Sequence, residues 1–236
     1  MMNSANKHDL AHYLAAKFTD FNSSDAERIT KLVCTYGNSI LTNDDNIENE
    51  DDITNCMSEE ADQRVVRHVL NCSKFFSRVD ALTIDADVLA LIISAFPAFK
   101  SVNQSVVVFC GTGLGSSSIE YYTVSVIGDI LGDKVCKGLP FFYAFTGCDT
   151  VSSFYGHSKS KFWDTWMTSK KKEESTQVFQ VLSDQPTNIS TEQLNIIEDF
   201  VVEVYYLGKK NCEIGFKTKR TFHAACRSKP SQSSSF

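Results

Sequence analysis

The sequence predicts an α/β fold with a mainly parallel central sheet flanked by helices. Short β-prone apolar runs alternate along the chain with segments whose apolar residues recur at helical spacing. The 236 residues are enough to bury a core, and the 42% hydrophobic content excludes a wholly disordered chain. In parallel sheets ligands bind beyond the carboxyl ends of the strands, so residues that directly follow a strand are the first candidates for a site.

The first third of the chain predicts a helix, a strand, a loop and a second helix. Leu10, Tyr13, Leu14 and Phe18 share one face of the first helix. The strand is short and β-prone, the loop is acidic and rich in asparagine, and Ser58 can cap the second helix. These elements are expected at residues 7–22, 32–36, 43–55 and 58–70.

The middle of the chain predicts strands and helices in alternation. A helix from Asp87 to the Pro97 region separates two buried strands, and a third strand leads into two helices. Gly111 to Gly115 has neither the spacing nor the lysine of a phosphate loop, so it predicts a β-hairpin connection. The strands are expected at 79–84, 105–110 and 119–124, and the later helices at 125–131 and 133–145.

The remainder predicts a helical extension that carries basic residues. Ser190 and Gln193 form a capping box before a helix at 191–206. We expect a PIN-like α/β core at 7–156, a helical basic extension at 157–226 and a disordered serine-rich tail at 227–236.

Charge is distributed unevenly along the chain. Residues 42–62 hold nine acids and no lysine or arginine, whereas residues 207–230 hold seven bases and one acid. The segment 157–172 has five lysines against one aspartate. The net charge of -6 argues against a surface coated with bases for nucleic acid, but separated charges can bind a cation at one place and a polyanion at another.

The compartment is expected to be the nucleus or the cytoplasm. The start of the chain lacks the apolar core of a signal peptide, so the eight cysteines are expected to be reduced thiols. None lies in a C-x-x-C pair, which argues against a structural zinc site. The apolar run 88–99 is too short to cross a bilayer, so no membrane partner is expected.

Asp85 and Asp87 follow the predicted strand 79–84 directly. In an extended chain, side chains two residues apart point the same way, so both carboxylates can face one site. A divalent cation such as Mg²⁺ would satisfy such a pair. The alternative, equally favoured for the pair alone, is that Asp85 is a helix N-cap.

Two further acidic motifs each have a structural interpretation. Glu59, Glu60 and Asp62 open a helix, where the helix dipole favours acids without any function. Glu59 and Asp62 would share a helix face, but which glutamate joins Asp62 stays open. Asp149 follows an apolar run at a glycine turn, and the turn alone can explain an aspartate there.

The order of these motifs resembles the acidic set of PIN and flap-endonuclease-like nucleases. In those proteins a glutamate-rich helix start precedes an Asp-x-Asp strand end and a Gly-x-Asp turn. More closely, Glu59-Glu60-Ala61-Asp62, Ile84-Asp85-Ala86-Asp87-Val88-Leu89 and Leu139-Pro140 to Phe145-Thr146-Gly147-Cys148-Asp149-Thr150-Val151-Ser152 resemble an uncharacterised metazoan family of transposable-element-like open reading frames. The resemblance covers residues 7–166 and extends more weakly to 225, and its most specific piece is the Thr-Gly-Cys-Asp segment.

The resemblance implies metal-dependent hydrolysis of phosphodiester bonds in DNA or RNA. Two Mg²⁺ or Mn²⁺ ions would clamp the attacking water and the leaving oxygen. The implied catalytic residues are Asp62, Asp85, Asp87 and Asp149, which would also be metal ligands together with Glu59 or Glu60. Lys159 and Lys161 would face backbone phosphates at the start of a helix, although an exposed helix start is the better explanation for each lysine taken alone.

The sequence departs from this pattern before Asp62. The nuclease fold begins with a strand that carries the first acidic residue, and the chain opens with a helix instead. The expectation is therefore a fragment or a degenerate copy, with a missing segment or a partner chain completing the sheet. The alternative function is a module that only binds nucleic acid or protein.

A minor alternative is a haloacid-dehalogenase-like phosphatase. Asp85-Ala86-Asp87-Val88 after a strand resembles the first motif of those enzymes, and Gly128-Asp129 with Asp133 resembles their last acidic motif. The short interval between the two motifs argues against it, because it leaves little room for the intervening strand-helix units.

Overall fold

The structure is a computed structural model of the 236-residue chain, and it is an α/β protein. It describes residues 4–19, 32–36, 39–42, 53, 61–112, 119–148, 151–185 and 187–206. The chain forms two compact units, Met1–Asn71 and Cys72–Phe236, which are treated separately below. Within the described ranges, no helix has the length and apolar character needed to span a membrane.

The first unit contains a helix, a β-hairpin and the start of a second helix. Helix α1 (Ser4–Thr19) packs against β1 (Val33–Tyr36) and β2 (Ser39–Thr42), which pair antiparallel. Helix α3 (Ala61–Phe75) begins in this unit. The predicted helix at 7–22 and strand at 32–36 are confirmed, whereas β2 was not predicted. The predicted apolar stripe of α1 is exposed, and among the described side chains of this helix Ala15 is buried.

The second unit is built on a three-stranded mixed sheet. Its strands are β3 (Arg78–Leu82), β4 (Val107–Thr112) and β5 (Glu120–Thr123), in the order β3-β4-β5. Strands β3 and β4 are parallel and joined through helices α4 (Ala86–Ser94) and α5 (Phe96–Val102).

The third strand does not follow the predicted parallel arrangement. Strand β5 runs antiparallel to β4, so the expectation of a mainly parallel sheet holds only for the pair β3–β4. A parallel crossover takes about a dozen residues or more, and the link at 113–119 is shorter. The link therefore joins two antiparallel neighbours, as the glycine-rich segment predicted.

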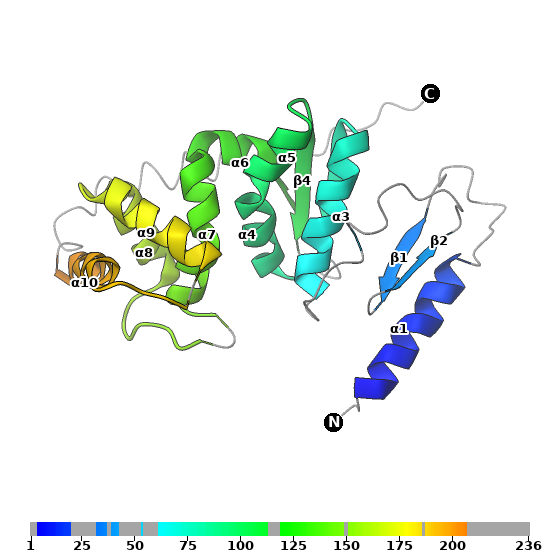
Figure 1. Ribbon diagram of the computed structural model, residues 1–236, viewed down its shortest axis with the longest axis horizontal. Coiled ribbons are helices and arrows are strands. Elements are labelled where there is room, and N and C mark those ends of the chain that lie inside the picture. Colours follow the sequence, from blue (N-terminus) through cyan, green and yellow to red (C-terminus); the bar gives the residue numbers. More distant parts are fainter. Residues whose placement is uncertain are drawn as a thin grey trace. The chain divides into compact units, whose positions relative to one another are not determined.

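Helices cover the sheet and extend away from it (Figure 1). Helices α4 and α6 (Val124–Leu131) contact β4, and α7 (Asp133–Phe145) packs against α4 and α6. Val79, Ala81, Val108 and Cys110 from β3 and β4 are buried. Helix α7 thus connects the sheet layer to the helices that follow it in the chain.

The last three described helices pack on one another around a group of aromatic rings, to which α7 also contributes. Helices α8 (Lys159–Thr168), α9 (Lys172–Asp184) and α10 (Thr191–Tyr206) follow in order, and α9 has the most extensive contact with α7. The capping box of α10 is confirmed, because Gln193 N donates to Ser190 Oγ at 3.2 Å and Ser190 N to Gln193 Oε1 at 2.9 Å. Buried aromatic residues of this region are Phe142, Phe162, Trp166, Phe179 and Phe200.

Because the thiols of Cys110 and Cys136 are fully buried, we expect the free energy of unfolding to fall at alkaline pH. Burial raises the pKa of Cys110 to about 11 and that of Cys136 to about 12, from an ordinary value of 9.0. The folded state therefore keeps both protons while the unfolded state begins to lose them near pH 9. Their stabilisation is complete below pH 9 and is lost as the pH rises through about 11, by up to about 1.4 kcal/mol per pH unit for each thiol.

Urea unfolding at a series of pH values from neutral to alkaline measures this slope. A double variant, Cys110→Ala with Cys136→Ala, is the control. We expect its free energy of unfolding to fall less steeply above pH 9 than that of the unchanged chain. Equal slopes would show that other groups cause the alkaline loss.

Candidate functional site

The candidate site lies where β3 ends and α4 begins. Thr83 N donates to Gly111 O at 2.9 Å, which extends the parallel pairing by one residue beyond β3. Asp85 N then donates to Thr83 Oγ1 at 3.0 Å. Asp85 is the N-cap of α4, and its Oδ1 accepts a hydrogen bond from Asp87 N at 2.9 Å. The prediction that Asp85 is a helix N-cap is therefore confirmed.

Asp85 has the predicted extended backbone, but the prediction that the extended chain continues to Asp87 is wrong. Strand β3 ends at Leu82, and Ile84, expected as its last buried residue, is 77% exposed. Asp87 already belongs to the first turn of α4. The cap causes this change, because it turns the Asp85 carboxylate back onto the amide of Asp87. The two carboxylates remain neighbours, but through a helix start and not through a strand.

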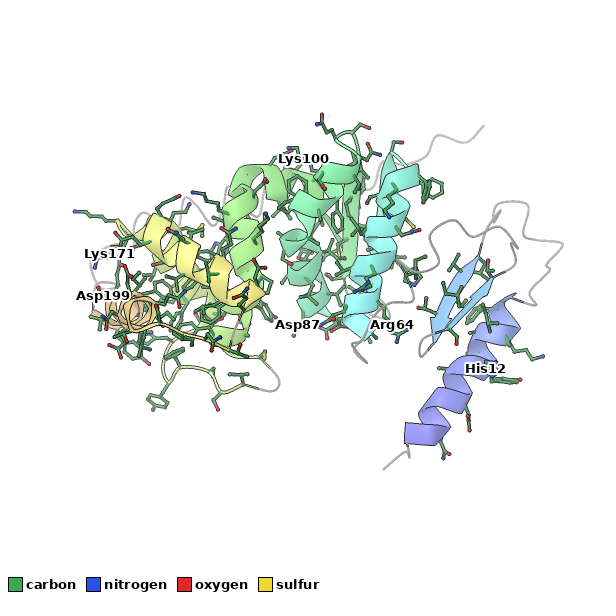
Figure 2. All side chains as sticks on the ribbon, in the orientation of Figure 1. His12, Arg64, Asp87, Lys100, Lys171 and Asp199 are labelled. Atoms are coloured by element: carbon green, nitrogen blue, oxygen red, sulfur yellow. The ribbon has the colours of Figure 1, made fainter. Side chains whose placement is uncertain are left out.

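Asp87 is half-buried at the start of α4 (Figure 2). The hydroxyl of Tyr143, from α7, donates to Asp87 Oδ1. Burial raises the pKa of Tyr143 far above its ordinary value, and the hydrogen bond to Asp87 and the charges of Asp87, Asp85 and Cys148 raise it further. Tyr143 is therefore a neutral donor at any physiological pH.

Lys159 lies against the same tyrosine. Its Nζ donates to the main-chain oxygen of Tyr143 at 3.1 Å and lies 3.0 Å from the centroid of the Tyr143 ring. Burial lowers the pKa of Lys159, while the charges of Asp87 and Cys148 act in the opposite direction. We call Asp85, Asp87, Tyr143 and Lys159 the tyrosine cluster. The cluster combines two carboxylates, a phenol and an ammonium group. Asp85 is the N-cap of α4, and the other three residues lie in α4, α7 and α8.

Lys161 has a different set of partners. Its Nζ bonds to His157 Nδ1 at 3.0 Å, and its amide donates to the N-cap oxygen of Ser158 at 3.3 Å. Side chains two residues apart on a helix point to different sides. Lys159 and Lys161 therefore do not present one common surface, although the predicted helix start at Ser158 is confirmed.

Of the other predicted metal ligands, one lies in α3 and the rest lie outside the described residues. Asp62 lies half-buried in the first turn of α3, in the first unit, and is not without a partner. Glu59, Glu60 and Asp149 lie outside the described residues. In the ranges that the structure covers, no three histidine, cysteine, aspartate or glutamate residues gather as a metal-binding group. Of the predicted set, the structure thus brings together Asp85 and Asp87.

The carboxylate oxygens of Asp85 and Asp87 meet part of what a hard divalent cation requires of its ligands. Within the described ranges, one oxygen of each carboxylate, Oδ2 of Asp85 and Oδ2 of Asp87, accepts no hydrogen bond. Mg²⁺ is commonly held by one or two carboxylates and several waters, so two available oxygens meet its minimum requirement. The two Oδ1 atoms are already fixed by the amide of Asp87 and the hydroxyl of Tyr143.

The second motif of the phosphatase-like alternative does not lie at a strand end. Gly128 and Asp129 are inside α6. Asp129 forms an exposed ion pair with Lys100 at 2.5 Å. Their positions are explained by helix packing and by a surface ion pair.

A glycine turn follows α7, as predicted. Gly147 has a φ of 104°, and Cys148 and Val151 pair through two main-chain hydrogen bonds of 3.2 and 3.1 Å. A Cβ on Gly147 would lie 2.7 Å from Ser153 Cβ and 2.8 Å from Ser153 Cα. Both the backbone conformation and the close approach therefore require glycine.

Replacing Gly147 by alanine is expected to lower the free energy of unfolding by about 2–3 kcal/mol, since the positive φ costs about 1–2 kcal/mol and the contact with Ser153 adds to it. Gly156→Ala is the matched control, because Gly156 has a φ of 75° and open space around it. Urea unfolding compares the two variants. A Gly147→Ala chain no less stable than Gly156→Ala would contradict this account of the turn.

Tyr143 was missed by the sequence analysis. It lies in the apolar run Leu139–Phe145, where an aromatic residue is expected to be part of the core. Its hydroxyl was the available signal, because a buried tyrosine usually has a hydrogen-bond partner.

Comparisons with protein-family models, with curated proteins and with solved structures found no match to this chain.

Proposed function

We propose that this chain is a nuclease-like domain that hydrolyses phosphodiester bonds with Mg²⁺ or Mn²⁺. The observation that carries the proposal is the pair Asp85 and Asp87 at the carboxyl end of a parallel strand, beside the ammonium group of Lys159, with one oxygen of each carboxylate accepting no hydrogen bond from the described residues. The carboxyl end of a parallel strand is where α/β proteins bind ligands. The resemblance to PIN-like nucleases names the same two residues.

Each residue of the cluster has a role in this proposal. Asp85 and Asp87 would hold a cation through their Oδ2 atoms. The resemblance also implies Glu59 or Glu60, Asp62 and Asp149 as ligands. Lys159 would attract the phosphate that is cleaved. When bound, the cation would activate water and stabilise the charge on the leaving oxygen.

The second candidate is a module that binds nucleic acid or protein without cleaving it. The hydrogen bond from Asp87 N to Asp85 favours this candidate, because it gives the Asp85 carboxylate a structural task that needs no cation. Loss of catalytic ligands in a degenerate copy would leave such a cap in place.

A cleavage assay with a capping-competent variant separates the two candidates. The chain and its Asp85→Asn variant are incubated with Mn²⁺ and single-stranded, duplex and flap substrates of DNA and RNA. Asparagine caps a helix as well as aspartate does, so the fold is retained while the charge is removed. Asp80→Asn is the control, since Asp80 is an exposed carboxylate of β3 paired with Arg78 at 3.0 Å.

The proposal predicts cleavage by the unchanged chain and by Asp80→Asn, and cleavage no faster than in a protein-free blank by Asp85→Asn. Binding of substrate without cleavage by all three proteins would support the binding module. Equal cleavage by Asp85→Asn and the unchanged chain would refute a catalytic role for Asp85.

A further inference from the structure

Tyr143 contacts two of the three charged residues of the tyrosine cluster, Asp87 and Lys159. Its hydroxyl donates to Asp87 Oδ1, and its main-chain oxygen and ring hold Nζ of Lys159. The three residues come from α4, α7 and α8, so one side chain links three helices. Residues 87, 143 and 159 are far apart in the sequence, and helix packing brings them together.

The surroundings of Tyr143 fix its position. Helix α7 packs against α4 on one side and α9 on another (Figure 1). On the same helix, Phe142 is buried and stacks on Trp166 with ring centroids 4.9 Å apart. A phenol carried by such a helix offers its hydroxyl and its ring from a fixed place. A rigid donor is what a metal-binding carboxylate needs from its neighbours.

The two contacts act on opposite charges. A carboxylate that accepts a hydrogen bond from a fixed donor loses rotational freedom and presents its second oxygen in one direction. An ammonium group over an aromatic face is stabilised by the ring, and more so where water is excluded. Tyr143 thereby keeps a lysine and an aspartate close together without a direct ion pair between them in the described residues.

We propose that Tyr143 is a positioning residue of this site. Its hydroxyl orients Asp87 toward a divalent cation, and its ring and carbonyl hold Lys159 where a phosphate bound to that cation would meet a second positive charge. This inference rests on the proposed function and adds a residue that neither the acidic motifs nor the resemblance includes. Tyr143 would touch neither cation nor substrate.

The first test measures Mn²⁺ affinity by isothermal titration calorimetry on the full chain and on Tyr143→Phe. Phenylalanine keeps the ring and removes only the hydroxyl, so Asp87 loses its donor while Lys159 keeps its contacts. We expect Mn²⁺ to bind about 10-fold more weakly to Tyr143→Phe, as when the partner of a metal ligand is removed. Tyr205→Phe is the matched control, because its hydroxyl donates to Tyr155 O at 3.1 Å, away from this cluster.

Melting temperatures without metal separate positioning from a general loss of stability. We expect both tyrosine variants to melt within a few degrees of the unchanged chain, since each loses one hydrogen bond. Unchanged Mn²⁺ affinity in Tyr143→Phe, with binding by the unchanged chain, would overturn the inference alone. Absence of Mn²⁺ binding by the unchanged chain would overturn the proposed function and this inference with it.

A second test examines Lys159 without any metal. The rate at which an amine-reactive reagent labels Lys159 is measured by mass spectrometry in the unchanged chain, in Tyr143→Phe and in Tyr143→Leu. We expect slow labelling in the first two proteins and labelling at least several-fold faster in Tyr143→Leu, which lacks the ring. Equal rates in all three would overturn the role of the ring.

Discussion

Replacing Trp166 by alanine is expected to lower the free energy of unfolding by about 4 kcal/mol. Trp166 has no exposed surface and lies between helices. Its ring is 4.9 Å from Phe142, 5.0 Å from Phe179 and 5.5 Å from Trp163 between centroids. Its Nε1 also donates to Thr176 Oγ1 at 2.9 Å, so alanine removes packing and a buried hydrogen bond together.

Trp163→Ala is the matched control for this variant. Trp163 lies on the same helix but is only half-buried, so we expect a loss of about 2 kcal/mol. Urea unfolding followed by circular dichroism measures both variants without depending on tryptophan fluorescence. Equal losses would show that Trp166 is not the centre of the packing among α7, α8 and α9.

Gly128→Ala is expected to destabilise the protein by about 3 kcal/mol. In an ordinary helix this change would stabilise by up to about 1 kcal/mol. A Cβ on Gly128 would instead lie 2.2 Å from Phe96 Cδ1 and 2.3 Å from Phe96 Cγ. Phe96 is only 3% exposed and cannot move aside freely, so the steric cost exceeds the gain in helix propensity.

A neighbouring glycine tests this explanation. Gly132, at the end of α6, has a φ of 78° and no atom within 4 Å of an added Cβ. Gly132→Ala should therefore cost only the backbone term, about 1–3 kcal/mol, because φ 78° with ψ 158° is a conformation that residues other than glycine rarely adopt. Thermal unfolding of both variants provides the comparison. A Gly128→Ala variant as stable as the unchanged chain would show that α5 and α6 can separate without cost.

Much of the fold of the second unit is predictable because its signals are local. The apolar run before Asp85, the spacing of the later helices and the Ser190–Gln193 capping box each specify an element without distant contacts. Helix α9 was missed although Glu173 and Glu174 occupy its first turn and Val178, Phe179 and Leu182 recur at helical spacing.

Strand direction was less predictable than strand position. The run at 119–124 was expected to form a strand, and β5 is found there. Its antiparallel direction follows from the short connection to β4, a constraint that the alternation of strands and helices does not include. The number of residues that connect two strands therefore decides their relative direction, which the hydrophobic periodicity does not determine.

The site was predictable as a location and not as a set of contacts. Asp85 and Asp87 follow a strand in the sequence, and the structure places them at the end of β3. The Tyr143 hydroxyl and the Lys159 ammonium reach this location from α7 and α8. Such contacts depend on how helices pack, which the spacing of residues in the sequence does not encode.

The central claim is that Asp85 and Asp87 bind a divalent cation in the folded chain. The most direct measurement is the melting temperature of the unchanged chain and of Asp87→Asn, each with and without millimolar Mn²⁺. A ligand that binds only the folded state at 100 times its dissociation constant stabilises it by about 2.7 kcal/mol. The account predicts a rise of several degrees for the unchanged chain and little or none for Asp87→Asn. The same rise in both proteins, or none in either, would contradict it.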